Sequence, residues 1–322
     1  MGEFDLIRRY FQHPLRPAGV VLGNGDDCAL LTPAPGQTLA VSTDMLVEGR
    51  HFFPDVDPEA LGHKALAVNL SDLAAMGAEP LAFTLALSLP NVDEAWLAGF
   101  SKGLLALADA HGCALVGGDT TAGPLNVCIT VFGQVPAPLA LRRNAAQVGD
   151  DIYVSGTLGE ARLALEALQG KAHLSAAELN TVRQRLERPT PRVALGMALR
   201  GAAHAAADVS DGLMGDLGHI LTASGVGADL LWESIENSIA TNSIFISGKT
   251  HFLPDFFLNG GDDYELVFTA PPSAHQQVQD AGTQTQTTVT RIGTICAQPG
   301  LRVLSRSGQP VAVQGRSFDH FA

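Results

Sequence analysis

The sequence predicts a two-domain α/β protein, on the basis of its length, its apolar content and the alternation of strand-like with helix-like segments. The chain has 322 residues, 46% of them hydrophobic and 16% charged, as in globular proteins with a sizeable core. A stretch rich in proline and small residues, 135–151, divides it. We therefore expect an N-terminal domain over 1–137 and a C-terminal domain over 148–322.

The spacing of apolar residues predicts the elements of the N-terminal half. In 93–111, Trp96, Phe100 and Leu104 recur at helical spacing, and Gly112 follows as a helix-ending residue. The same reasoning predicts a helix over 58–77 and strands over 39–43, 81–89, 113–116 and 126–135.

The C-terminal half repeats the alternation of strands and helices. A strand at 152–156 opens it, and an apolar run before "DVSDG" ends a second strand. Short echoes, such as GGDT at 117–120 and GGDD at 260–263, are compatible with two related halves. Helices are expected over 158–169, 175–187, 192–201 and 213–224.

Charge and cysteine usage narrow the class of protein. The formal net charge of −13 disfavours nucleic acid as a partner, because phosphate backbones require a basic surface. The cysteines form no CxxC pair and read as small hydrophobes of a reducing compartment; they are Cys28, Cys113, Cys128 and Cys296. The N-terminus is charged where a signal peptide is apolar, and no apolar run reaches the ~20 residues of a membrane span. We expect a cytoplasmic protein without membrane contact.

Aspartates recur beside glycines and hydroxyl residues at the ends of apolar runs. Alone, each is most simply a turn residue or a helix cap. Together they resemble one site, with few cations nearby, and oxygen ligands without histidine or cysteine select magnesium or calcium. Several magnesium ions among aspartates are typical of polyphosphate chemistry. The set is Asp26, Asp27, Asp44, Asp119, Asp208, Asp211, Asp262 and Asp263.

Asp72 belongs to this group although it lies within a predicted helix. It shares a helix face with Asn69, and the helix is otherwise so rich in alanine and leucine that this face is expected to pack. A buried ionised carboxylate needs a cation, and Lys64 is the only local candidate in the sequence. The alternative is a solvated surface aspartate.

The sequence "SGKT" at 247–250 imitates the end of a phosphate-binding loop. The full motif requires a glycine at the position of Ser243, so we reject this interpretation. A nucleotide would then be held through metal ions and backbone groups.

Seven motifs follow one another along nearly the whole chain. They are "GEFDLIRRYF", "GDDCALL", "STDMLVEGRHF", "KALAVNLSDLAAMGAEP", "GGDTT", "DVSDGL" and "GGDDYEL". In this order they resemble the thiamine-monophosphate kinase family, in the aminoimidazole ribonucleotide synthetase-like superfamily. The resemblance implies a two-domain fold and a homodimer built through the N-terminal domains. It also implies ATP- and magnesium-dependent phosphorylation of thiamine monophosphate to thiamine diphosphate.

Family roles transfer to matching positions of this sequence. We expect no dedicated catalytic base, because the acceptor phosphate is already anionic near neutral pH. The implied magnesium ligands are Asp27, Ser42, Thr43, Asp44, Asp72, Asp119, Asp208 and Asp211. The implied ATP-binding residues are Gly118, Asp119, Arg143 and Ser210, and the implied substrate-binding residues are His51, Asp262 and Phe318.

Two features depart from the family pattern. Asp262 stands where the family has glutamate, and its shorter side chain is expected to weaken or reposition a substrate contact. The segment 233–258 matches no family motif. Two other functions stay open: ATP-dependent activation of an amide or of selenide within the same superfamily, and a non-catalytic acidic protein that binds calcium or nucleotide as a sensor.

Overall fold

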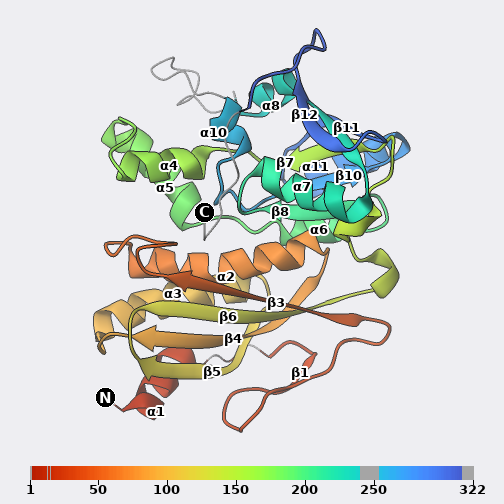
Figure 1. Cartoon of the computed structure of the whole chain (residues 1–322). Helices are drawn as coiled ribbons and strands as arrows, with labels where there is room; N and C mark the ends of the chain where they lie inside the picture. The colour runs from red at the N-terminus through yellow and green to blue at the C-terminus, as the bar shows by residue number, and fades with distance from the viewer. Residues whose placement is uncertain (1, 13, 15, 240–253, 314–322) are drawn as a thin grey trace. The chain divides into compact units, whose positions relative to one another are not determined.

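The computed structural model describes residues 2–12, 14, 16–239 and 254–313 (Figure 1). Contacts divide the chain into two compact units: residues 1–73 with 78–138, and residues 74–77 with 139–322. Among the described residues, no helix is long and apolar enough to cross a membrane. Phe318 and the centre of the unmatched segment, 240–253, lie outside the described residues.

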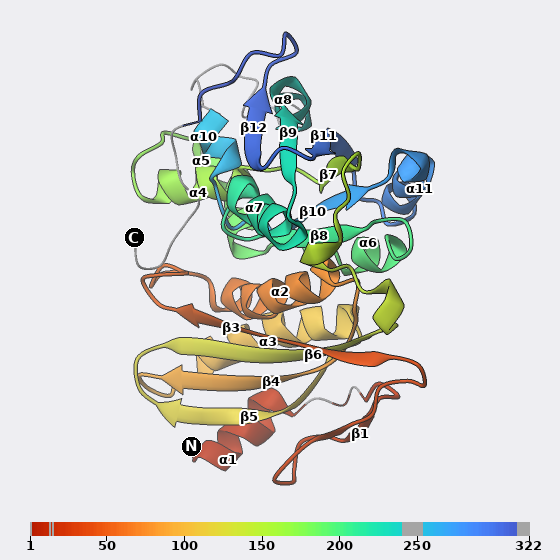
Figure 2. The ribbon, with the colours of Figure 1, turned by 45° about the vertical axis from the view of Figure 1, so that its right-hand side comes forward.

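The first unit is built on a four-stranded sheet in the order β3-β6-β4-β5. β4 and β5 run parallel, and the other neighbours are antiparallel. Helices α2 and α3 lie along one face of this sheet (Figure 2). The elements of the unit are α1 (Glu3–Leu6), η1 (Ile7–Phe11), β1 (Val20–Leu22), β2 (Leu30–Leu31), β3 (Thr38–Val47), α2 (Pro58–Ala75), β4 (Glu79–Leu89), α3 (Glu94–Ala110), β5 (Ala114–Ala122) and β6 (Asn126–Val135).

The edge strand β3 presents two different faces. On the side of α2 its residues are partly or fully buried, as at Leu46, which is 4% exposed. On the other side Val41 and Met45 are 56% and 51% exposed, and Leu39 and Val47 lie exposed on the same face. Large apolar side chains are rarely left in water in a row. We call these four residues the open face of β3.

Helices α2 and α3 approach each other through two glycines. A Cβ atom on Gly62 would lie 2.0 Å from the carbonyl oxygen of Phe100, and one on Gly103 would lie 1.9 Å from that of Glu59. These distances leave no room for a methyl group, so the crossing depends on both glycines. α3 begins at the N-cap Asp93, whose carboxylate accepts the N–H groups of Ala95 and Trp96.

Cys113 directly precedes β5 and is fully buried. Burial raises the pKa of its thiol far above the ordinary value. Cys28, by contrast, lies exposed in the loop between β1 and β2.

The second unit contains a six-stranded sheet in the order β12-β9-β11-β7-β10-β8, antiparallel except for β12 and β9. The short helix η2 (Ala137–Leu139) spans the boundary between the units. The elements of the second unit are η3 (Arg143–Ala145), β7 (Asp151–Ser155), α4 (Glu160–Leu168), α5 (Ala176–Glu187), α6 (Val193–Ala198), β8 (Ala205–Val209), α7 (Leu213–Ser224), β9 (Gly227–Leu231), α8 (Trp232–Ile239), α10 (Pro254–Leu258), β10 (Glu265–Ala270), η4 (Pro272–Ala274), α11 (His275–Gln284), β11 (Val289–Cys296) and β12 (Gly300–Leu304).

The core of the second unit forms between the sheet and α7. Leu213, Leu217 and Ile220 are fully buried in one cluster with the sheet residues Val154 and Val267. α4 and α5 bury a smaller apolar cluster between them. α8 and α10 show that both ends of the unmatched segment 233–258 are helical.

The structure corrects the expectation that the aspartates sit where strands end. Asp44 lies within β3 and Asp119 within β5. The GGDD sequence precedes β10, and the apolar run before it ends in the short helix α10. Both strands continue through consecutive polar residues, 42–44 in β3 and 119–121 in β5, which apolar runs alone did not reveal.

Candidate active site

Strand β3 and helix α2 bring four oxygen-bearing side chains together in the first unit. Ser42 donates a hydrogen bond to the Asp72 carboxylate. The backbone N–H of Asp44 donates to Oδ1 of Asn69 at 3.1 Å. Asn69 is 1% exposed, whereas Asp44 and Asp72 are half-buried. This group, Ser42, Asp44, Asn69 and Asp72, is well suited to a hard cation because every side chain offers oxygen.

Asp119 lies away from that group. It pairs with Ala86, so it stands on β5, three strand spacings from β3, which corresponds to roughly 14 Å. No group of three or more His, Cys, Asp or Glu that could hold a metal occurs among the described residues. Within one chain Asp44 and Asp119 are therefore not neighbours, and the single site for all the aspartates stays a prediction.

Two further sequence-predicted residues lie in turns of the first unit. Asp27 is exposed in the loop between β1 and β2, and its N–H donates to the Asp26 carboxylate at 3.0 Å. His51 is half-buried, and its Nδ1 accepts the N–H of Val47 at 3.0 Å. In the neutral ring this bond places the proton on Nε2. Thr43 faces the side of the sheet opposite to Asp44, where its hydroxyl bonds that of Thr130 at 2.8 Å.

In the second unit the loop between β8 and α7 gathers a second group. Asp208 is the fourth residue of β8 and is 4% exposed, and Ser210 and Asp211 follow at the end of the strand. Arg143 in η3 is exposed, and its charge acts on a carboxylate of α7 beside this loop. The structure thus brings together four of the sequence-predicted residues that belong to this unit.

That carboxylate is Asp216, which sequence reasoning missed. It is 3% exposed, and its Oδ2 accepts the N–H groups of Ser210 at 3.0 Å and Asp211 at 3.1 Å. Burial raises the pKa of Asp216 to about 7, opposed by these two hydrogen bonds and by the Arg143 charge, while the Asp211 charge adds to the rise. The signal in the sequence was an acidic residue in the first turn of an otherwise apolar helix.

The GGDD loop lies against the same strand end. Asp262 donates its N–H to the carbonyl of Ser210 at 2.8 Å, and Tyr264 donates to that of Val209 at 2.9 Å. Asp262 and Tyr264 have φ values of 66° and 51°, in the left-handed region that few side chains adopt. A Cβ on Gly261 would lie 2.4 Å from the Ser210 carbonyl, so this approach requires glycine.

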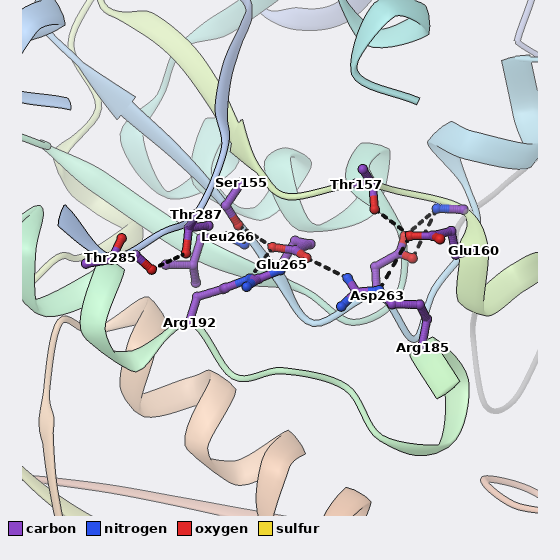
Figure 3. Close-up of polar contacts among 11 residues, drawn as sticks. Ser155, Thr157, Glu160, Arg185, Arg192, Asp263, Glu265, Leu266, Thr285 and Thr287 are labelled. Atoms are coloured by element: carbon purple, nitrogen blue, oxygen red, sulfur yellow. Dashed lines mark hydrogen bonds and ion pairs between the residues drawn. The ribbon is translucent and has the colours of Figure 1, made fainter. Parts of the chain in front are cut away.

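Behind this loop lies a buried ion network, shown in Figure 3. Glu265 is fully buried and accepts hydrogen bonds from Arg185 at 2.6 Å, Arg192 at 2.7 Å and Ser155 at 2.6 Å. Burial alone would raise the pKa of Glu265, but the two guanidinium groups and the Ser155 hydroxyl hold it below its ordinary value. The expectation of few cations near these motifs is therefore wrong at Glu265. The two arginines were missed because they are distant in sequence.

Asp263 belongs to the same network, but its pKa is shifted in the opposite direction to that of Glu265. Both of its carboxylate oxygens accept the N–H of Gly159, at 3.0 and 3.1 Å, and it is 2% exposed. Burial raises the pKa of Asp263 well above its ordinary value, although the Gly159 bond and Arg185 oppose the rise. Asp263 and Glu265 thus anchor the GGDD loop inward, while Asp262 follows the β8–α7 loop.

Comparison with known proteins places this architecture in a family. Two family models match, "AIR synthase related protein, N-terminal domain" over residues 25–135 and "AIR synthase related protein, C-terminal domain" over residues 147–305. A thiamine-monophosphate kinase of Salmonella typhimurium is 47% identical over 324 residues, covering 100% of this chain and 98% of the relative.

Two solved structures are also similar. The thiamine-monophosphate kinase of Stenotrophomonas maltophilia is 45% identical with a TM-score of 0.83, covering 97% of this chain and 98% of the other. A structure described as AaThiL complexed with AMPPCP and TMP is 29% identical with a TM-score of 0.77, covering 90% of this chain and 89% of the other. These matches confirm the resemblance seen in the motifs and the two-domain α/β fold: the chain belongs to the thiamine-monophosphate kinase family of AIR synthase related proteins.

Proposed function

We propose that this protein transfers the γ-phosphoryl group of ATP to thiamine monophosphate, forming thiamine diphosphate. The observation that carries the proposal is the full-length similarity to a thiamine-monophosphate kinase, together with the two oxygen-rich groups described above. AaThiL, in complex with AMPPCP and TMP, supports a nucleotide and a thiamine phosphate as ligands. This reaction involves no nucleic acid, in keeping with the formal net charge of −13.

Magnesium fits the residues present. Ser42, Asp44 and Asp72 would hold one part of the metal set, with Asp27 as a further oxygen donor. The Thr43 hydroxyl lies on the opposite face of β3 and does not join this group within one chain. Asp119 in the first unit, and Asp208 and Asp211 in the second, would be further magnesium ligands. When bound, the ions neutralise the charge repulsion between two phosphate-bearing reactants.

The residues that would bind the nucleotide are Gly118 and Asp119 of β5 in the first unit, and Arg143 and Ser210 in the second. Arg143 offers a guanidinium fork suited to phosphate oxygens, and Ser210 offers a hydroxyl beside it. The residues that would contact the thiamine phosphate are His51, Asp262 and Phe318. The neutral His51 ring carries its proton on Nε2. The acceptor phosphate is already anionic near neutral pH, so the chain needs no residue that removes a proton. Catalysis then consists of positioning and charge stabilisation.

We further propose a homodimer built through the first unit. The open face of β3 exposes Leu39, Val41, Met45 and Val47, and a second copy would cover it. The distance of Asp119 from Asp44 within one chain adds support, because a second chain could complete what one chain separates. The free cysteines Cys28, Cys113, Cys128 and Cys296 favour a reducing compartment such as the cytoplasm.

The test is a coupled assay with purified protein, ATP, magnesium and thiamine monophosphate, in which thiamine diphosphate is measured. EDTA and free thiamine are the controls. We expect product only when magnesium and the monophosphate are both present. Magnesium-dependent binding of ATP without thiamine diphosphate formation would exclude this substrate. If ATP is then turned over, another reaction of the superfamily is favoured. If ATP is bound without any turnover, the protein is a sensor.

A further inference from the structure

Asp216 is a carboxylate buried beside the proposed nucleotide site, and the reaction outlined above assigns it no role. It lies in the first turn of α7, whose neighbouring residues Leu213 and Leu217 are fully buried in the core. Burying a carboxylate costs free energy that must be offset by hydrogen bonds. The partners that Asp216 has found are therefore informative about what the position does.

The two hydrogen bonds of Asp216 go to the loop, and not to the helix that carries it. Its Oδ2 accepts from the N–H of Ser210 at 3.0 Å and from that of Asp211 at 3.1 Å. The N-cap residue of α7, Gly212, has no side chain that could do this. Asp216 thus reaches back from inside the helix and fixes two consecutive peptide groups ahead of it.

The peptide groups on either side of Ser210 are fixed from two directions. Asp216 holds the N–H, and the Ser210 carbonyl accepts the N–H of Asp262 at 2.8 Å. The missing side chain of Gly261 permits this approach, since a Cβ there would lie 2.4 Å from the same carbonyl. A continuous chain of hydrogen bonds therefore links Asp216, Ser210 and Asp262.

We propose that Asp216 is a positioning residue of this enzyme: its buried oxygen holds the backbone of Ser210 and Asp211 and so directs their side chains toward nucleotide and metal. The proposal rests on the proposed function of Ser210 and Asp211. Asp216 itself touches neither substrate nor metal in this account. Groups that orient metal ligands from outside typically change metal affinity or activity by about 10- to 100-fold when removed.

The test compares three variants of the full-length protein. Asp216→Ala removes the acceptor, Asp216→Glu displaces it by one methylene group, and Asp216→Asn keeps an oxygen at the same place. We expect the magnesium concentration for half-maximal turnover to rise, and kcat to fall, by about 10-fold or more for Ala and Glu. Asp216→Asn should stay within a few-fold of the wild type, because its Oδ1 accepts the same two bonds.

Asp150→Ala is the matched control for lost stability. Asp150 is 2% exposed and also holds a loop, accepting the N–H of Gln147 at 2.9 Å, but it lies beside His204, before the start of β8. Thermal unfolding ranks the variants by stability. If Asp150→Ala loses as much magnesium affinity as Asp216→Ala at equal stability, or if Asp216→Glu behaves like the wild type, the proposal is overturned.

Magnesium-dependent binding of AMPPCP, measured by calorimetry, separates this proposal from the proposed function. A wild type that binds the nucleotide without making thiamine diphosphate contradicts the substrate assignment alone. Weaker binding by Asp216→Glu than by Asp216→Asn would still support the positioning role. Equal binding by both would refute it, and this comparison holds even if Asp216→Ala does not fold.

Discussion

Asp44 illustrates how one residue serves both fold and site. Its backbone pairs with Ile129 in the sheet and its N–H reaches Asn69, so the strand holds its position whatever its side chain does. The side chain lies on the α2 side of β3, next to Asp72 and Ser42 in the same group. Its charge therefore has little part in packing, and its loss is expected to affect chemistry more than folding.

We predict that Asp44→Asn lowers kcat by two orders of magnitude or more, the size of effect expected for loss of transition-state charge stabilisation of roughly 3 kcal/mol. The unfolding midpoint should change little, because the backbone bonds remain. Turnover and thermal unfolding are measured on the same preparation, with the exposed Asp280→Asn in α11 as control. Near-normal turnover would remove Asp44 from the metal set.

Glu265 is expected to show the reverse behaviour. It is fully buried between Arg185 and Arg192, so Glu265→Gln leaves two half-buried guanidinium groups without their anion. We predict a loss of about 3 kcal/mol or more in the free energy of unfolding near pH 7, measured by urea denaturation. Ser155→Ala, which removes a neutral partner of the same carboxylate, should cost only about 1 kcal/mol.

The pH dependence of this effect has a definite sign. The folded-state pKa of Glu265 lies below its ordinary value of 4.5, so its contribution to stability is present above that pH. It is lost as the pH falls through the lower, folded-state pKa. The difference between wild type and Glu265→Gln should therefore shrink in acid below pH 4.5. A difference that stays constant down to pH 3 would show that the charge of Glu265 is not what stabilises the fold.

At the scale of elements, helices α2 and α3 depend on contact between their backbones. Gly103→Ala would push a methyl group onto the Glu59 carbonyl, 1.9 Å away, and we predict destabilisation by about 1 to 3 kcal/mol. Gly218→Ala in α7 is the matched control, since nothing lies within 4 Å of its Cβ. That change should stabilise by about 0.5 to 1 kcal/mol through helix propensity. Both values come from denaturant unfolding, and equal effects would contradict the close crossing.

Helices and strands were more predictable from the sequence than the site was. Periodic apolar residues predicted α7 and β6 with the bounds that the structure shows, 213–224 and 126–135. The partners of Glu265 could not be predicted, because Arg185 and Arg192 lie 80 and 73 residues earlier and only the fold brings them near. The left-handed backbone of Asp262 was also hidden, although aspartate tolerates this conformation better than most residues.

At the scale of the whole molecule, the open face of β3 carries the proposed dimer. We predict that Val41→Asp turns the dimer into a monomer, because a charge would have to be buried in an apolar contact. Light scattering after size-exclusion chromatography measures the mass. Val148→Asp, at a residue 59% exposed in the second unit, is the control and should leave the mass unchanged. A wild type that is monomeric at micromolar concentration would exclude the dimer.

The reactivity of the Cys113 thiol reports opening of the first unit. This thiol is fully buried and its pKa is raised, so a thiol reagent in solution finds almost no thiolate to attack while the unit stays closed. Cys28, exposed in the same unit, reacts at once and marks time zero. The delay between the two modifications therefore reads out how often this part of the chain opens in its native state, without any denaturant.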